Sequence, residues 1–342
     1  MKPVEVLGVP GSPYTRKMIA LLRYRRIAHR VVWGSHFQPP SGYPAPKVAL
    51  LPTVYFHTQG GREAVVDSTP IIRRLEDDYR MHEPERSVRP DDELLRFLDL
   101  LIEDYADEWL TKAMFHYRWH FEADARNAGP LLALWNDLQL DAGAARASAA
   151  MFARRQIDRL PVVGSSPATA PVIEASYRRL IGILDRIIER QGFVLGTRPC
   201  SADFALYGQL TQLGQIDPTP RRLLEQASPR LRAWLDRVED LSGHPVRGWL
   251  ARDLIADHLG ELLGEIGQVY APFLLANARA IAAGQATFEA VIDGRPWSQA
   301  VFPYQAKCLA TLRQAREDLG TEERQTLDRM LAGTGCEALF AH

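Results

Sequence analysis

The sequence predicts an α/β domain followed by a longer all-helical region, and two observations lead to this prediction. Over residues 1–82, strand-like and helix-like segments follow one another in the order βαβ and then ββα. From residue 90 to about residue 249, strand-like alternation disappears and helical periodicity replaces it. A chain of 342 residues with 46% hydrophobic residues can form two domains and an appendage. We therefore expect domains at residues 1–82 and 90–250 and a C-terminal extension at 251–342.

The first segment, residues 4–17, joins a short apolar strand to a helix through a glycine- and proline-containing turn. Ser12 is a favoured N-cap residue and Pro13 a favoured first helical residue. The free backbone N–H groups and the positive end of the helix dipole therefore point to the oxygen of Ser12. An anion, above all a thiolate, would be stabilised at this position.

The rest of the α/β region follows from similar patterns. Residues 29–33 form a predicted second strand, and a loop rich in proline and glycine covers residues 34–46. Residues 53–56 and 63–66 flank a Gly-Gly turn and predict a hairpin. Asp67-Ser68 then caps a second helix that ends near Tyr79.

Composition excludes several function classes. Basic residues are interspersed with carboxylates and the net charge is -1, which argues against a nucleic-acid surface. No apolar run is long enough for a bilayer span, and the N-terminus lacks the pattern of a signal peptide, so we expect a cytoplasmic protein without membrane contact. Cys200, Cys308 and Cys336 follow no disulfide or zinc spacing and are interpreted as reduced thiols.

One helical stripe in the second region carries charged and histidine side chains at every fourth position: Asp104, Glu108, Lys112, His116 and His120. Two histidines at i and i+4 are able to bind a transition metal. The glutamate-centred pattern of zinc proteases is absent, so we interpret the stripe as charge pairs along a helix and predict no metal.

Four motifs resemble the glutathione transferase superfamily. Residues 12–18, Ser-Pro-Tyr-Thr-Arg-Lys-Met, resemble the serine-type active-site turn of its bacterial members, and Leu51-Pro52-Thr53 resembles the cis-proline turn. Residues 66–69 resemble the acidic-residue-plus-serine turn, and residues 196–206 the capping box of the core helix. The resemblance covers residues 1–250 and implies a thioredoxin-like N-terminal domain followed by an all-helical glutathione-transferase-type C-terminal domain with an extension.

The resemblance also implies glutathione as cosubstrate and assigns roles to residues. Ser12 would donate a hydrogen bond to the glutathione sulfur and favour its thiolate, with the Tyr14 phenol as rival. Leu51, before Pro52, would offer its N–H and C=O to the cysteinyl unit. Asp67 would bind the ammonium of the γ-glutamyl group, and Ser68 its carboxylate.

Two positions depart from the family pattern. Lys47 lies five residues before Pro52 instead of two, so its carboxylate contact is open, and Trp33, His36 or Gln38 are the alternatives for the glycyl end. Cys200 replaces the Ser or Thr of the helical capping box; either Ser201 takes over the cap or Asp203 caps alone.

The second substrate would bind between the Ser12 turn and residues 102–124, which are rich in aromatic side chains. We expect Tyr105, Trp109 and Tyr117 to line this pocket and to accept a hydrophobic electrophile.

The leading hypothesis is therefore a homodimeric glutathione transferase. A glutathione-dependent reductase, dehalogenase or isomerase, and a non-catalytic binding protein on the same scaffold, are the alternatives. Residues 251–342 are mostly helical with a possible short β-hairpin at the Asp-Gly turn of residues 293–294. This extension would cover the active site, extend a dimer interface or bind another partner.

Overall fold

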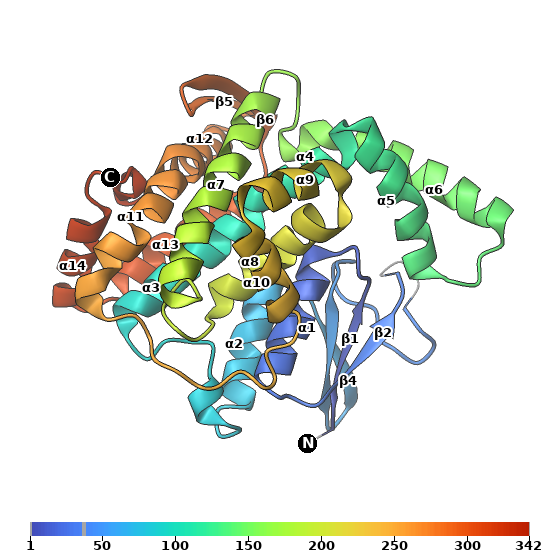
Figure 1. The fold of residues 1–342 in the computed structure, drawn as a ribbon, viewed down its shortest axis with the longest axis horizontal. Helices are drawn as coiled ribbons and strands as arrows, with labels where there is room; N and C mark the ends of the chain where they lie inside the picture. The colour runs from blue at the N-terminus through green and yellow to red at the C-terminus, as the bar shows by residue number, and fades with distance from the viewer. Residues whose placement is uncertain (1, 36–38, 342) are drawn as a thin grey trace.

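The computed structural model describes residues 2–35 and 39–341. Figure 1 shows the β-sheet at one end of the molecule, a bundle of helices at its centre, and the C-terminal extension on the side of the bundle away from the sheet. Helices α5 and α6 project from the bundle on the side of β2.

The N-terminal domain is a four-stranded sheet with two helices and has the predicted thioredoxin-like fold. Its elements are β1 (Val4–Gly8), α1 (Pro13–Tyr24), β2 (His29–Trp33), β3 (Thr53–Thr58), β4 (Gly61–Val65) and α2 (Ser68–Asp78). The strand order is β2-β1-β3-β4, with β1 parallel to β2 and antiparallel to β3, and β3 antiparallel to β4. The βαβ unit and the hairpin thus build one sheet around β1 and β3, whose apolar residues are buried.

The register of this sheet brings three turns to the same edge. Leu7 pairs with Thr53, so the turn after β1 and the segment before β3 lie next to each other. Val54 pairs with Val65, so the segment after β4 lies beside the start of β3. Residues 9–12, 51–52 and 66–68 therefore converge at one end of the sheet.

The second region is all-helical, as predicted. It contains α3 (Glu93–Tyr105), α4 (Thr111–His120), α5 (Glu122–Asn136), α6 (Ala142–Ile157), α7 (Ala170–Gln191), α8 (Ser201–Thr211), α9 (Pro218–Ala227) and α10 (Pro229–Val238). A π-helical turn, Ala106–Leu110, joins α3 to α4 as one long helix. Such turns insert an extra residue and are frequent at functional sites.

Helix α8 is the buried centre of this bundle and packs directly on α1. Every one of its residues is buried. At Gly208 the two helices approach so closely that a Cβ atom would lie 2.4 Å from the carbonyl oxygen of Pro13. A glycine at this position therefore fixes the distance between the two domains.

Carboxylates cap the start of α8, where Cys200 replaces the usual hydroxyl residue. Asp203 accepts the N–H groups of Cys200 and Val194, each at 2.9 Å. Asp99 of α3 accepts the hydroxyl of Ser201 and, at 2.8 Å, the N–H of Ala202. Asp203 thus supplies the carboxylate of the capping box, and Asp99, which is distant in sequence, completes the cap.

The C-terminal extension forms α11 (Ile255–Glu265), α12 (Ala271–Ala282), β5 (Thr287–Ile292), β6 (Arg295–Ala300), α13 (Pro303–Glu317) and α14 (Thr321–Leu331). Strands β5 and β6 form an antiparallel hairpin whose turn residues Asp293 and Gly294 both have positive φ, as a tight two-residue turn requires. Helix α11 packs on α7, while α13 and α14 pack on α3. The buried apolar residues of the extension belong to the same hydrophobic core as those of the two preceding regions.

The division of the chain into domains at residues 82, 90 and 250 stays a proposal.

Within the described part of the chain, no helix combines the length and apolarity that a bilayer span requires.

Candidate active site at the domain boundary

Ser12 is the N-cap of α1 and is partly exposed. Its Oγ accepts the N–H of Thr15 at 3.2 Å, which satisfies one of the free donors of the first turn. Because the oxygen serves as acceptor in this cap, the hydroxyl hydrogen is left to be donated to a second group. Helix α5 covers the turn before Ser12, where a Cβ on Gly11 would lie 2.5 Å from Leu132 and 2.8 Å from Trp135.

Tyr14 lies on the cleft side of α1, and its hydroxyl is already used. It donates to the carbonyl oxygen of Asp107 at 2.8 Å. Burial, together with Glu108 and Asp107 nearby, raises the pKa of Tyr14 well above its ordinary value. The phenol therefore ties α1 to the π-helical turn of the second domain.

The Leu51-Pro52 bond is cis. Both residues line the cleft described below. The neighbouring Thr53 donates its hydroxyl to the carbonyl oxygen of Leu50 at 2.9 Å, which closes the turn before β3.

Asp67 and Ser68 lie at the N-terminus of α2, beside this turn. Asp67 has a φ of 77°, a left-handed conformation that costs energy for a residue with a side chain. Its carboxylate accepts the phenol hydrogen of Tyr304, from the first turn of α13, at 2.7 Å. The extension therefore contacts the N-terminal turn directly.

Beneath α2 lies a buried network around Lys17. The Lys17 ammonium donates to Ser68 Oγ at 2.9 Å, to Glu103 at 2.7 Å and to Asp107 Oδ2 at 2.6 Å. Burial opposes the charge on Lys17, but the two carboxylates raise its pKa above the ordinary value. Burial raises the pKa of Asp107 to about 6, although Lys17 opposes this shift.

A cleft of about 600 Å³ opens at this boundary. It is lined by the three N-terminal segments, by the helix α3–α4 and by the extension. The lining residues used below are Tyr14, Val48, Leu50, Leu51, Pro52, Asp67, Ser68, Asp104, Asp107, Glu108, Thr111, Lys112, Arg159, Val162, Gln299, Phe302, Tyr304 and Gln305. Ser12 lies at the neighbouring turn and is not among the lining residues.

The predicted aromatic wall is absent from this cleft. Tyr105, Trp109 and Tyr117 are buried in the core and line none of its surface. Trp109 packs on Trp297 and Phe273 of the extension at ring distances of 5.4 and 5.7 Å, and its indole N–H donates to Ser176. Tyr105 and Trp109 are covered by rings of the extension, and Tyr117 packs on Tyr177 of α7, so this aromatic face of α3–α4 is buried and the polar face lies at the cleft.

That polar face is the stripe at every fourth position. Asp104, Glu108 and Lys112 line the cleft. Burial raises the pKa of Asp104 to about 7, and burial with Asp104 beside it raises the pKa of Glu108 to about 8. Burial lowers the pKa of Lys112 to about 7. Lys112 donates to the carbonyl of Val163 and to Gln299 at 3.2 and 3.3 Å and lies over the ring of Phe273.

The remaining predicted residues lie elsewhere. Lys47 is exposed and outside the cleft lining, and Trp33 is 54% exposed on the outer strand β2. His36 and Gln38 fall outside the described residues. His116 is buried, bonded to Ser165 at 2.8 Å, and stacks on His120. Among the described residues, no group of three or more potential ligands is arranged to hold a metal ion.

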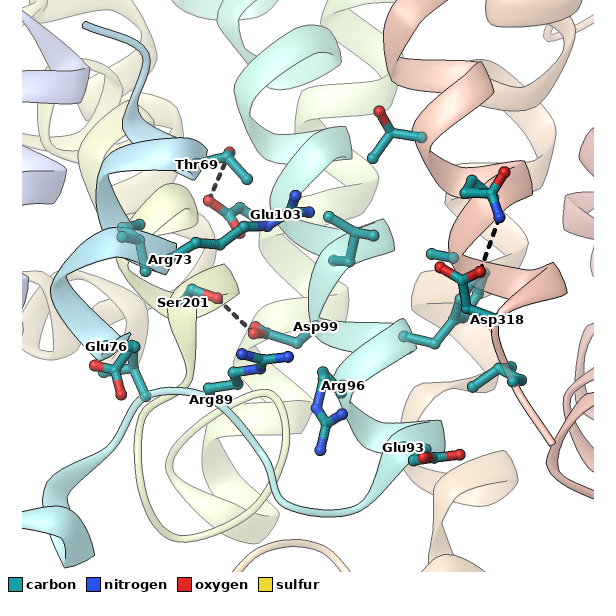
Figure 2. Close-up of a pocket in the computed structure, with 18 residues that line it drawn as sticks. Thr69, Arg73, Glu76, Arg89, Glu93, Arg96, Asp99, Glu103, Ser201 and Asp318 are labelled. Carbon is teal, nitrogen blue, oxygen red and sulfur yellow. Dashed lines mark hydrogen bonds between the residues drawn. The ribbon is translucent and has the colours of Figure 1, made fainter. Parts of the chain in front are cut away.

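A second cavity, of about 460 Å³, lies between α2, α3 and α13. Figure 2 shows Arg73 reaching across it from α2 toward α3, with Arg89 and Arg96 near Asp99. Glu103 lines this cavity and accepts the Thr69 hydroxyl at 2.9 Å, while Thr69 itself lines both cavities. Of the residues bonded to Lys17, Glu103 lines this cavity, whereas Ser68 and Asp107 line the first.

Comparisons with known proteins agree with this architecture. Residues 6–85 match the N-terminal domain of glutathione S-transferases, and residues 143–237 match their C-terminal domain. The chain belongs to the glutathione S-transferase family. Comparison with curated protein sequences gives no match.

Three solved structures illustrate the likeness of this transferase-family chain to others. A GST-like protein from Pseudomonas syringae is 17% identical, with a TM-score of 0.41 over 70% of this chain and 67% of that chain. The β-etherase LigF from a Sphingobium strain is 15% identical, with a TM-score of 0.45 over 76% of this chain and 100% of that chain. A Methylobacterium radiotolerans glutathione S-transferase in complex with glutathione sulfonate is 17% identical, with a TM-score of 0.33 over 69% and 95%.

Several residues of the site escaped sequence reasoning. Lys17 is buried beneath α2, and its position near the start of α1 does not indicate this from the sequence. Tyr304 bonds Asp67 across 237 positions of the chain. Gln305 bonds Glu108 across 197 positions. The charged spacing at positions 104, 108 and 112 was the one available signal, and it indicated a common helix face without showing which surface that face meets.

Proposed function

We propose that this glutathione S-transferase family member binds glutathione where its three N-terminal turns converge and transfers it to an electrophile. The observation that supports this proposal is the sheet register, which brings the Ser12 turn, Leu51-Pro52 and Asp67-Ser68 to one edge beside a cleft of about 600 Å³. An extended peptide-like ligand fits such an edge, because the backbone groups of Leu51 are able to pair with it.

The γ-glutamyl end and the thiol of glutathione each have a suitable partner in this proposal. Asp67 accepts the γ-glutamyl ammonium, and the N–H groups at the start of α2, with the Ser68 hydroxyl, bind the carboxylate. Ser12 donates its free hydroxyl hydrogen to the sulfur. The bound thiol loses its proton to solvent, and each unit by which its pKa falls increases the thiolate fraction near neutral pH about tenfold.

The thiolate then attacks an electrophilic carbon of the second substrate in the cleft. A carbon–sulfur bond forms, and either the leaving group departs with the bonding electron pair or, in an addition, the product takes up a proton. The sulfur is the nucleophile, so no protein side chain becomes covalently modified.

A second candidate function is a non-catalytic binding protein on the same scaffold. Its support is that Tyr304 already bonds Asp67 and that Lys17 already bonds Ser68. Both side chains of the proposed γ-glutamyl site are thus engaged by the protein itself. The homodimer and the cytoplasmic location stay predictions, and light scattering of the purified chain tests the dimer.

Calorimetric titration with reduced glutathione tests the proposal first. We expect saturable binding in wild type that weakens in Asp67→Asn, and turnover of model electrophiles that falls in Ser12→Gly. Glycine is a suitable replacement, because it retains most of the N-cap stability while it removes the hydroxyl. Absence of binding at millimolar glutathione would instead support the non-catalytic candidate.

A further inference from the structure

The cleft wall opposite the N-terminal turns contains buried hydrogen-bond acceptors without partners. Oδ1 of Asp107 and Oε1 of Gln305 have no hydrogen-bond donor among the described residues. Their residues are only 7% and 5% exposed, and both line the cleft. A buried acceptor without a donor costs about 1–3 kcal/mol, so these oxygens favour a ligand that brings one.

The charged residues that line the cleft also favour a ligand that donates hydrogen bonds. Asp67, Asp104, Asp107 and Glu108 line the cleft, against two basic residues, Lys112 and Arg159. Lys112 already has protein partners in Val163, Gln299 and the Phe273 ring. Arg159 lies exposed at the cleft edge.

Glu108 and its partners form part of this acidic wall. Glu108 is half-buried, and Gln305 donates its amide N–H to the Glu108 carboxyl at 3.1 Å. Asp104, one turn before, is half-buried and accepts the phenol of Tyr270 at 2.6 Å. The π-helical turn contributes both Asp107 and Glu108 to the cleft.

The mouth of the same cleft is apolar. Val48, Leu50, Val162 and Phe302 line it, and each is exposed, Val48 by 56% and Phe302 by 42%. Exposed apolar side chains gathered around a cavity mark a surface for an apolar ligand body. The cleft is thus apolar at its edge and rich in acceptors within.

From this arrangement we infer that the second substrate is an amphiphile whose apolar or aromatic body carries the electrophilic carbon and whose protonated amine binds among Glu108, Asp107 and Gln305. The inference rests on the proposed function, because it names the chemical class of the electrophile held in that cleft. An ammonium supplies three donors and a positive charge, which match the orphaned oxygens and the acidic lining together.

Three probes of similar size test this inference on the full-length protein without glutathione. Phenethylamine, phenethyl alcohol and phenylacetate share an aromatic body and differ in the charge of the head group. Calorimetry at about pH 9, where Glu108 with its pKa of about 8 is ionised and a primary amine is still largely protonated, should give a dissociation constant about tenfold or more smaller for the amine than for the alcohol, as a charge-assisted hydrogen bond provides. Phenylacetate should bind more weakly than both. Equal affinities for the amine and the alcohol, or tighter binding of phenylacetate, would overturn the inference.

A matched pair of variants locates the preference. Glu108→Gln keeps the shape of the side chain and should reduce the preference for the amine several-fold while affinity for the alcohol stays the same. The control Glu289→Gln changes an exposed residue on β5 and should retain the full preference. An amine preference that survives Glu108→Gln unchanged would contradict the assignment. If that variant does not fold, the ranking of the three probes in wild type still decides.

These measurements are independent of the glutathione site. Amine preference without glutathione binding would refute the proposed transferase function and leave the amine site standing. Glutathione binding without amine preference would refute the amine site alone.

Discussion

The phenol of Tyr304 donates a hydrogen bond of 2.7 Å to the carboxylate of Asp67, and so joins the C-terminal extension to the first turn of α2. The two residues are 237 positions apart in the chain. Burial and the bond to Asp67 raise the pKa of Tyr304, so the phenol stays protonated and remains a donor. The extension is therefore a wall of the candidate active site.

Replacing Tyr304 by Phe should strengthen glutathione binding. The substitution removes a donor that competes with the γ-glutamyl ammonium for Asp67, and one hydrogen bond to a charged group corresponds to about a two- to tenfold smaller dissociation constant after solvent competition. Calorimetric titration measures the effect. Tyr43→Phe is the control, because Tyr43 bonds Glu5 at 3.0 Å on β1, away from the cleft. Weaker binding in Tyr304→Phe would mean that the phenol itself contacts the ligand.

Gly208→Ala should loosen the contact between the two domains. Alanine is normally the better helix former, but its Cβ would lie 2.4 Å from the Pro13 carbonyl oxygen, and backbone must shift to accommodate it. We expect a loss of about 1–3 kcal/mol in the free energy of unfolding. Denaturant unfolding measures this loss, with Gly243→Ala as control, because a Cβ there meets nothing within 4 Å. Equal stability of the two variants would contradict the close packing of α1 on α8.

Glu108 should make stability depend on pH. Its pKa is raised from 4.5 to about 8 in the folded protein, first by burial and then by Asp104. The folded state therefore keeps a proton that the unfolded chain loses, and stability falls as pH rises through this window, by about 1.4 kcal/mol for each unit of pKa difference between the two states.

Chemical unfolding at several pH values between about 5 and 8 checks this prediction. The Glu108→Gln variant should have a flatter profile than wild type, and its stability relative to wild type should be higher at the upper end. Lys112, whose pKa is lowered to about 7, contributes an opposite slope above that pH in both proteins. Parallel profiles for wild type and variant would show that Glu108 ionises normally.

The N-terminal turns around the candidate site could be predicted from the sequence, because local rules determine where their strands and helices begin. An N-cap before proline predicts where α1 begins, and alternating apolar residues around a Gly-Gly turn predict β3 and β4. Pairing of adjacent strands then brings residues 12, 52 and 67 to one edge. Each step depends on neighbours within a few positions or on strands that follow each other in the chain.

The part of the cleft formed by α3–α4 and the extension could not be predicted from the sequence, because packing between segments distant in the chain determines it. Trp109 and Glu108 are adjacent in sequence, and the aromatic residue was the natural choice for an apolar pocket. The extension supplies Phe273 and Trp297 as partners for Trp109, which buries it. No local pattern indicates that residues 273 and 297 return to this helix.

The decisive measurement is the pKa of the glutathione thiol bound to the protein. Ultraviolet difference spectroscopy follows thiolate formation against pH in wild type, Ser12→Gly and Tyr14→Phe. We expect a thiol pKa below that of free glutathione in wild type and in Tyr14→Phe, and a rise by about one unit or more in Ser12→Gly. An unchanged thiol pKa in Ser12→Gly, with glutathione still bound, would contradict the assignment of Ser12 as the activating residue.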